Sequence, residues 1–149
     1  MRVVIVEDDY LQADWIKNLL LSRLGVADGD VELIATECEF RDRLENFRAH
    51  PPSLFVIDVM LRWADATADY RPSPPDVKEE GFFRAGLRCE RLLRQARETK
   101  RIPVVLYTVL EESELEPGLK SVGTATKYIG KSSADADLVA HINELAARR

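Results

Sequence analysis

The sequence has few of the features that define several large classes of protein. Its only two cysteines, Cys38 and Cys89, are too few and too far apart for a disulfide framework or a metal knuckle, so we expect reduced thiols. It has no long run of lysine and arginine, and its formal net charge is −5, which disfavours direct binding to nucleic acid or to an anionic membrane. No apolar run approaches the roughly 20 residues of a membrane span. Because a strand-like segment already starts at Arg2, we also expect no signal peptide and a cytoplasmic location.

What is present is the composition of a soluble globular protein. Hydrophobic residues make up 46% of the chain and charged residues 32%, which argues against disorder. A length of 149 residues suits one domain with a sizeable core. We found no internal repeat and no low-complexity tract, and therefore expect a single domain over residues 1–149.

The stretch Leu54–Asp58, with the sequence Leu-Phe-Val-Ile-Asp, is an apolar run that ends abruptly in a carboxylate. Four large apolar residues without polar alternation are typical of a strand covered on both faces, which usually belongs to a parallel sheet. Ligands of such sheets bind at the carboxyl ends of the strands. Asp58 is therefore a candidate functional residue.

The other segments alternate between strand and helix patterns. Strands are predicted at Arg2–Val6, Val31–Ala35, Ile102–Thr108 and Thr126–Gly130. Helices are predicted at Tyr10–Leu24, at Glu39–Arg48, at Leu87–Ala96, more weakly at Glu111–Val122, and after Ser132 or Ser133, either of which would cap the last helix. Five strands and five helices in this order predict an α/β fold, a doubly wound parallel sheet with helices on both faces.

One long segment fits neither pattern. Residues Arg62 to about Glu80 contain three prolines and no sustained period, so we predict a long inserted loop. Such loops are often functional, which leaves two readings open: a partner-binding or shielding element, or a solvated insertion. Trp63 and Tyr70 are candidates to anchor the loop or a partner.

The predicted strand ends bring five polar residues to one edge of the sheet: Glu7, Asp8, Asp58, Thr108 and Lys131. Crowded carboxylates repel one another unless a cation lies among them, and oxygen ligands of this kind favour Mg²⁺. Asp58 would then be a carboxylate nucleophile that forms an aspartyl phosphate. Thr108 and Lys131 would bind phosphoryl oxygens. Taken singly, each residue has a purely structural explanation, and for Asp9 we favour a helix cap.

This combination resembles the receiver domain of two-component response regulators, over essentially the whole chain apart from Arg62 to about Glu80. The resemblance implies a flavodoxin-like sheet with strand order 2-1-3-4-5. It also implies Mg²⁺ ligands at Glu7, Asp8, Asp58 and the Met60 backbone carbonyl, with Asp58 as the phosphoacceptor and Thr108 and Lys131 assisting. Thr108 and Tyr128 match the switch residues.

The same resemblance implies a stand-alone, phosphorylation-dependent signalling switch. A histidine kinase or phosphotransfer protein would phosphorylate Asp58, and the face formed by the fourth helix, fifth strand and fifth helix would then bind a downstream protein or form a homodimer. We do not expect the protein to be an enzyme, except that it would assist its own phosphorylation and dephosphorylation. A degenerate receiver that binds partners without phosphorylation is the alternative. A phosphohydrolase is disfavoured because Met60 stands where such enzymes of the haloacid dehalogenase type have a second acid.

Three residues depart from the family pattern. Arg62 and Ser132 stand where the family commonly has proline, in the second case in a cis peptide. Val109 follows Thr108 where small residues are usual, and we expect its branched side chain to slow the gain or loss of phosphate.

Overall fold

Five parallel strands form one central sheet. The structure, a computed structural model, describes residues 1–66 and 70–147. The strands are β1 (Val3–Val6), β2 (Val31–Ile34), β3 (Leu54–Ile57), β4 (Val104–Thr108) and β5 (Thr126–Gly130). Their order in the sheet is β2-β1-β3-β4-β5, and every neighbouring pair is parallel. The predicted flavodoxin-like topology is therefore confirmed.

Apolar side chains on both faces of the sheet explain why these strands form. Every residue of β1, β3 and β4 is buried, as expected of central strands that helices cover on both sides. Alternate residues point to opposite faces, so the sheet separates two hydrophobic clusters. One includes Phe40, Phe47 and Phe55. The other includes Ile16 and Ile142.

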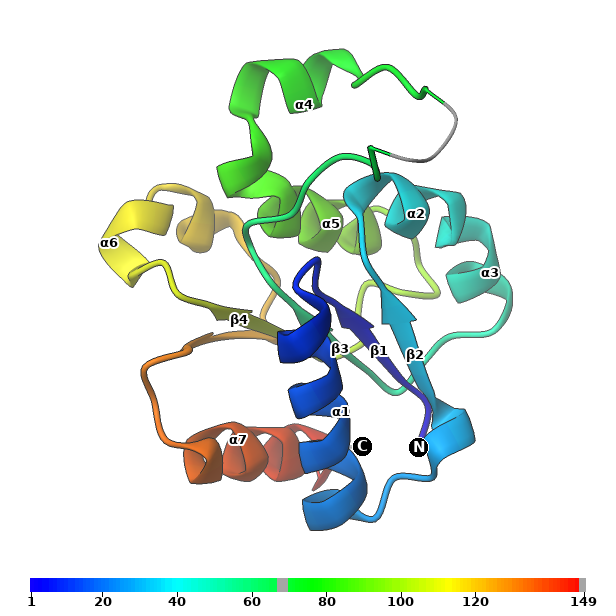
Figure 1. Cartoon of the computed structure of the whole chain (residues 1–149), viewed down its shortest axis with the longest axis vertical. Helices are drawn as coiled ribbons and strands as arrows, with labels where there is room; N and C mark the ends of the chain where they lie inside the picture. The colour runs from blue at the N-terminus through cyan, green and yellow to red at the C-terminus, as the bar shows by residue number, and fades with distance from the viewer. Residues whose placement is uncertain (67–69, 148–149) are drawn as a thin grey trace.

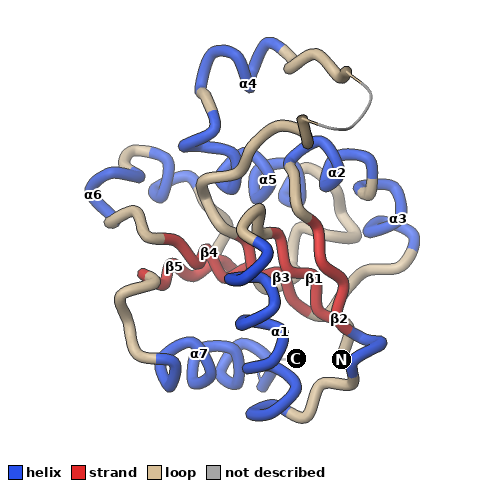
Figure 2. The backbone as a smooth tube through the Cα atoms, viewed as in Figure 1, coloured by secondary structure: helices blue, strands red, loops and turns tan. Residues whose placement is uncertain are grey.

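Helices cover both faces, as predicted (Figure 1). On one face lie α1 (Tyr10–Leu24) and α7 (Asp135–Ala147). On the other lie α2 (Glu37–Asp42), α3 (Leu44–Ala49), α5 (Ala85–Arg94) and α6 (Glu112–Leu115). Figure 2 shows the strands as the middle layer between these two groups. Across the described ranges, none of the helices has the length and apolar character needed to traverse a membrane.

Helix boundaries differ from the prediction in several places. The helix expected over Glu39–Arg48 is two short helices, α2 and α3. The weak candidate at Glu111–Val122 becomes α6 and a 3₁₀ turn at Gly118–Ser121. Further 3₁₀ turns lie at Asp28–Asp30 and Phe82–Arg84. Because α7 begins at Asp135, the expected cap at Ser132 or Ser133 is wrong.

Asp9 caps α1, as predicted. Its Oδ1 accepts hydrogen bonds from the backbone N–H groups of Leu11 and Gln12, at 2.9 and 3.1 Å. These N–H groups have no partner within the helix itself, so the cap stabilises the first turn.

The insertion after β3 is not the loop that we predicted. It contains a helix, α4 (Pro75–Glu80), which starts with proline, a residue suited to the first helical turn. In Figure 1, α4 lies outside α2 and α5, on their side away from the sheet. With α4, the described residues form seven α-helices rather than the five expected. Residues 67–69 of the predicted loop lie outside the described residues.

Side chains hold this insertion against α2 and α5. Arg41 donates to Asp76 at 2.7 Å, and the buried Arg88 donates to the Gly81 carbonyl at 2.7 Å. Trp63 donates from its indole N–H to the Arg71 carbonyl at 2.9 Å, and the Arg41 guanidinium lies 5.4 Å from the centre of its ring. The described part of the insertion is thus a packed element, which Trp63 helps to anchor.

Candidate functional site

The carboxyl edge of the sheet brings the predicted polar residues together. Glu7 and Asp58 follow the last residues of β1 and β3, Thr108 ends β4, and Lys131 follows β5. Backbone hydrogen bonds extend the ladder past the strand ends, from Asp58 N–H to the Val6 carbonyl and from Lys131 N–H to the Thr108 carbonyl, at 2.9 and 2.8 Å. The positions of these side chains are thus set by the strands themselves.

Lys131 joins two of the three carboxylates. Its ammonium group donates to Glu7 Oε2 at 2.6 Å and to Asp58 Oδ2 at 2.9 Å. The side chain of Lys131 is 10% exposed and that of Asp58 is 6% exposed. The other oxygen of Asp58, Oδ1, accepts from the Met60 N–H at 3.2 Å. Charge-assisted bonds in a site so little exposed to water fix the Asp58 carboxylate in one orientation.

One ammonium group does not neutralise this edge. Burial, followed by the nearby charge of Asp58, raises the pKa of Glu7 from 4.5 to about 7, although Lys131 opposes the shift. Burial lowers the pKa of Lys131, but Asp58 and Glu7 outweigh this effect and leave it raised. The site therefore holds a firmly charged lysine and an excess of negative charge, to which a further cation would be attracted.

Asp8 is held differently from the other two carboxylates. Its Oδ2 accepts from the backbone N–H of Arg62 at 3.0 Å, and its backbone carbonyl accepts from Arg62 Nη2 at 2.9 Å. Within the described ranges, no three histidine, cysteine, aspartate or glutamate side chains converge as a ready metal cage. The donor chemistry still fits a small hard cation, because the edge offers carboxylate oxygens and carries excess negative charge.

Thr108 and Tyr128 are linked through the backbone of one residue. The Leu110 N–H donates to Thr108 Oγ1 at 3.4 Å, and the Tyr128 hydroxyl donates to the Leu110 carbonyl at 2.6 Å. Thr108 is fully buried, and Tyr128 packs against the adjacent hydrophobic cluster. A movement of the Thr108 hydroxyl would thus remove a partner from the same peptide segment that holds Tyr128.

The acidic edge opens into a cavity of about 580 Å³. Seven of its lining residues were singled out from the sequence and two were not: the seven are Glu7, Asp8, Asp9, Asp58, Met60, Val109 and Lys131, and the two are Gln12 and Phe82. Val109 is 62% exposed at the rim. Phe82 was missed because it comes from the turn that ends the insertion, and only the tertiary fold brings it to this edge. The Lys131–Ser132 peptide bond is trans, whereas the family pattern commonly has a cis peptide at this position.

Gly86 is a second residue that the sequence did not reveal. The first turn of α5 packs directly behind the end of β3, and the Gly86 N–H donates to the Val59 carbonyl at 2.9 Å. A Cβ atom at this position would lie 2.6 Å from the Val59 Cα and closer still to the Asp58 carbonyl oxygen. Glycine is therefore required for the close approach of α5 to the site. The sequence placed this glycine directly before the predicted helix at Leu87–Ala96, where a glycine is not unusual.

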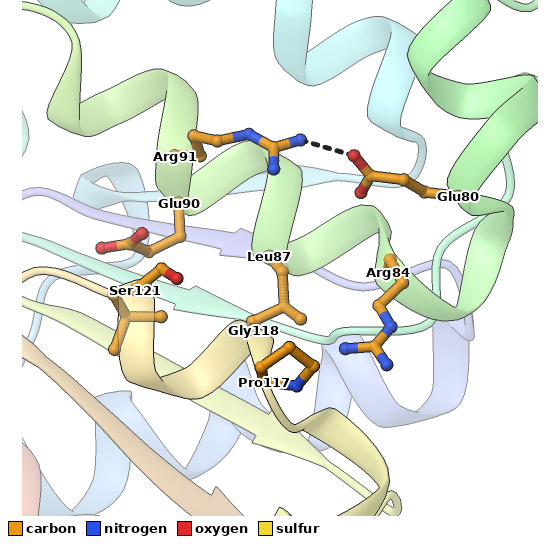
Figure 3. Close-up of a pocket in the computed structure, with 9 residues that line it drawn as sticks. Glu80, Arg84, Leu87, Glu90, Arg91, Pro117, Gly118 and Ser121 are labelled. Atoms are coloured by element: carbon orange, nitrogen blue, oxygen red, sulfur yellow. Dashed lines mark hydrogen bonds and ion pairs between the residues drawn. The ribbon is translucent and has the colours of Figure 1, made fainter.

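A separate cavity of about 310 Å³ lies between α5 and the 3₁₀ turn at Gly118–Ser121 (Figure 3). Leu87 and Pro117 line it, and the ion pair of Arg91 with Glu80 crosses one side at 2.9 Å. It shares no residue with the acidic edge. Its charged lining residues are two arginines and two glutamates, of which Arg91 and Glu80 pair with each other.

No protein-family model and no curated protein sequence matches this chain. Solved structures do match it, over almost its full length. The receiver domain of a Francisella response regulator matches with a TM-score of 0.67 and 21% identity, covering 99% of this chain and 97% of that one.

A second match is the signal receiver domain of a signal transduction histidine kinase from Syntrophus aciditrophicus, with a TM-score of 0.69 and 22% identity, covering 99% of this chain and 90% of that one. The chain has the receiver-domain fold. A further receiver structure, from a sensor histidine kinase of Pseudomonas aeruginosa, has a magnesium ion coordinated in its active-site cleft. It matches with a TM-score of 0.68 and 18% identity, covering 98% of this chain and 97% of that one.

Within the receiver fold, the acidic edge of this chain lies at the carboxyl ends of β1, β3 and β5. The predicted residues Glu7, Asp58 and Lys131 form one bonded cluster, and Met60 adjoins it. The predicted Asp8 lines the same cavity but is bonded to Arg62. Arg62 had been noted only as a departure from a family pattern, and its contact with Asp8 was not foreseen.

Proposed function

We propose that the protein is a signalling switch in which Asp58 accepts a phosphoryl group. The observation that carries this proposal is the Asp58 carboxylate itself, nearly buried, bonded to Lys131 and open to the 580 Å³ cavity. A carboxylate oxygen exposed to a cavity of this size can reach phosphorus, while the fixed ammonium group supplies positive charge next to it. The likeness to receiver domains supports a phosphorylation-based signalling role.

In the transfer of the phosphoryl group to Asp58, one bond to phosphorus forms while another breaks. An Asp58 oxygen forms a bond to phosphorus, and the bond between phosphorus and the donor nitrogen of a phosphohistidine breaks, so that the electron pair returns to the imidazole. Lys131 pairs with a phosphoryl oxygen, and the Thr108 hydroxyl donates to another. Glu7, Asp8, Asp58 and the Met60 carbonyl are the groups that would hold Mg²⁺. When bound, Mg²⁺ would neutralise the negative charge of the incoming phosphoryl group.

Phosphorylation would change the surface through Thr108. A phosphoryl group adds about −1.5 to −2 charges at neutral pH, with strong acceptor oxygens. If the Thr108 hydroxyl turns towards it, the Leu110 N–H loses its acceptor, and Leu110 is the residue whose carbonyl holds the Tyr128 hydroxyl. The predicted switch face, formed here by α6, β5 and α7, contains Tyr128. A local charge change would thereby alter a binding surface.

The partners that fit this proposal are a histidine kinase or phosphotransfer protein as donor and a downstream protein at the α6-β5-α7 face, where a homodimer is a further candidate. We propose no catalysis on a foreign substrate. The two histidines of the sequence, His50 and His141, lie outside the cavity at the acidic edge. The insertion after Asp58 ends in the turn that contributes Phe82 to that cavity, and we propose that it influences which donor approaches.

The test is incubation with acetyl phosphate and Mg²⁺, followed by intact-mass measurement. The expected result is one added phosphoryl group in the wild type and none in Asp58→Asn. Asp14→Asn, at an exposed position on α1, is the matched control and should be modified like the wild type. Wild-type protein that stays unmodified both with acetyl phosphate and with a panel of phosphorylated phosphotransfer proteins would refute the proposal.

A second candidate function is a binding platform that works without phosphorylation. The contact between Arg62 and Asp8 favours it, because an arginine occupies a residue that the receiver pattern assigns to the metal. This candidate predicts equal partner binding by the wild type and Asp58→Asn in a pull-down from a cell extract, with or without acetyl phosphate. The switch predicts a difference.

A further inference from the structure

Arg62 is fixed in place by the start of α2. Its backbone carbonyl accepts from the Glu37 N–H at 3.1 Å, and the carbonyl of the next residue, Trp63, accepts from the Cys38 N–H at 2.8 Å. These are N–H groups of the first helical turn, which otherwise lack partners. The backbone at Arg62 is therefore held at two successive residues, and its side chain projects from a rigid base.

From this base, Arg62 contacts Asp8 in three ways. The backbone N–H donates to Asp8 Oδ2 at 3.0 Å, Nη2 donates to the Asp8 carbonyl at 2.9 Å, and Nε lies 3.8 Å from Oδ2. Asp65 lies at 3.9 Å from the same Nε. The Asp8 side chain is 29% exposed and that of Arg62 is 53% exposed, so water screens the pair only in part.

The guanidinium group changes the charge that a metal ion would meet. Apart from it, Lys131 is the cation that the described residues bring to the three carboxylates. With it, a second fixed positive charge lies beside the one carboxylate that Lys131 does not bind. A divalent cation that approached Asp8 would be repelled by the guanidinium and would compete with it for the same oxygen.

We infer that Arg62 restrains Asp8 and weakens Mg²⁺ binding at the phosphoacceptor site. The inference rests on the proposed function, because it concerns the metal of that same site. Arg62 is thus a residue that sets metal affinity in this chain, and it ties the insertion that begins beside it to the readiness of Asp58 for phosphorylation. The opposite role, a brace that holds Asp8 ready for the metal, would give effects of the opposite sign.

The experiment measures Mg²⁺ binding by isothermal titration calorimetry on metal-free protein, without any phosphodonor. Arg62→Gln removes the charge and keeps a side-chain donor for the Asp8 carbonyl. It should bind Mg²⁺ about tenfold more tightly, which corresponds to about 1.4 kcal/mol. Arg62→Lys keeps the charge and should stay within about twofold of the wild type. The gain in Arg62→Gln should shrink in high salt, because the repulsion is electrostatic.

Arg71→Gln is the matched control, since Arg71 lies in the same insertion but pairs with Asp42 on α2. It should leave Mg²⁺ affinity unchanged. The inference would be overturned if Arg62→Gln bound Mg²⁺ no more tightly than the wild type, or if neither protein bound Mg²⁺. An equal increase in Mg²⁺ affinity in Arg71→Gln would also overturn it. Circular dichroism of each variant verifies that it is folded, and Arg62→Lys gives a second comparison if Arg62→Gln is not.

The two proposals fail separately. If Arg62→Gln binds Mg²⁺ more tightly but Asp58 takes no phosphoryl group from any donor, the inference on Arg62 stands and the switch does not. If Asp58 is phosphorylated while the Arg62 variants bind Mg²⁺ as the wild type does, the reverse holds.

Discussion

The ion pair between Glu37 on α2 and Arg88 on α5 offers the sharpest test of how the insertion is held. The two side chains are 0% and 1% exposed. Arg88 donates from Nε and Nη2 to the two oxygens of Glu37, at 2.8 and 2.7 Å, and from Nη1 to the Gly81 carbonyl after α4. Replacing Arg88 by methionine leaves a buried carboxylate without its principal partner.

The expected loss can be worked out from these contacts. Removing one partner of a buried pair typically destabilises a protein by about 3–5 kcal/mol, because the remaining charge is desolvated and unpaired. Arg41 still donates to Glu37 Oε1 at 2.9 Å, so the Glu37 charge keeps one partner. We therefore expect the low end of this range for Arg88→Met, about 3 kcal/mol of unfolding free energy.

The double variant Glu37→Leu with Arg88→Met separates the cost of an unpaired charge from the loss of the pair. Because both buried charges are gone, it should lose less than the single variant, within about 1–2 kcal/mol of the wild type. Arg91→Met is the matched control on the same helix. Arg91 is 55% exposed and pairs with Glu80, so we expect a loss below about 1 kcal/mol.

Equilibrium urea unfolding, followed by far-ultraviolet circular dichroism, measures all four proteins. Two results would refute the reasoning. The first is an Arg88→Met variant no less stable than the Arg91 control. The second is a double variant that loses more than Arg88→Met alone, which would mean that the pair itself, rather than relief from an unpaired charge, stabilises the fold.

Three further predictions concern the site. Burial and the charge of Asp58 raise the pKa of Glu7 from 4.5 to about 7. The contribution of Glu7 to stability is therefore complete below pH 4.5 and is lost as the pH rises through about 7. The free energy of unfolding should fall by up to roughly 3 kcal/mol over this range. Metal-free urea titrations at about pH 5 and about pH 8 should reveal this loss in the wild type and its absence in Glu7→Gln. Gly86→Ala should destabilise the protein by about 1–3 kcal/mol through overpacking, and equal melting curves would contradict this. Val109→Ala should speed the gain or loss of phosphate on Asp58, and unchanged rates would contradict it.

The sheet and its acidic edge could be predicted from the sequence because both depend on local sequence patterns. Uninterrupted apolar runs marked the central strands, and the carboxylates Glu7 and Asp58 directly followed two of them. In a parallel sheet, strand ends meet at one edge whatever the details of the helices. The convergence of Lys131 on both carboxylates therefore followed from topology, even though the residues are 124 and 73 positions away in sequence.

Features that depend on tertiary contacts escaped the prediction. The helix α4 has only six residues and too short a pattern to show a period, and contacts with α2 and α5 stabilise it instead. Charged residues on a helix are normally assumed to face water, so nothing marked Arg88 as one of the most buried side chains in the protein. For the same reason, the contact of Arg62 with Asp8 was invisible before the fold was known.

The insertion and the acidic edge share one structural support, the first turn of α2. Its Glu37 side chain binds Arg88 behind α4, while its Glu37 N–H holds the carbonyl of Arg62. Arg62 in turn contacts Asp8 at the acidic edge. Because each contact is made by a buried or backbone group, a shift of α2 would move both ends together. A partner that bound the insertion and shifted α2 would therefore also change the position of Arg62 beside Asp8.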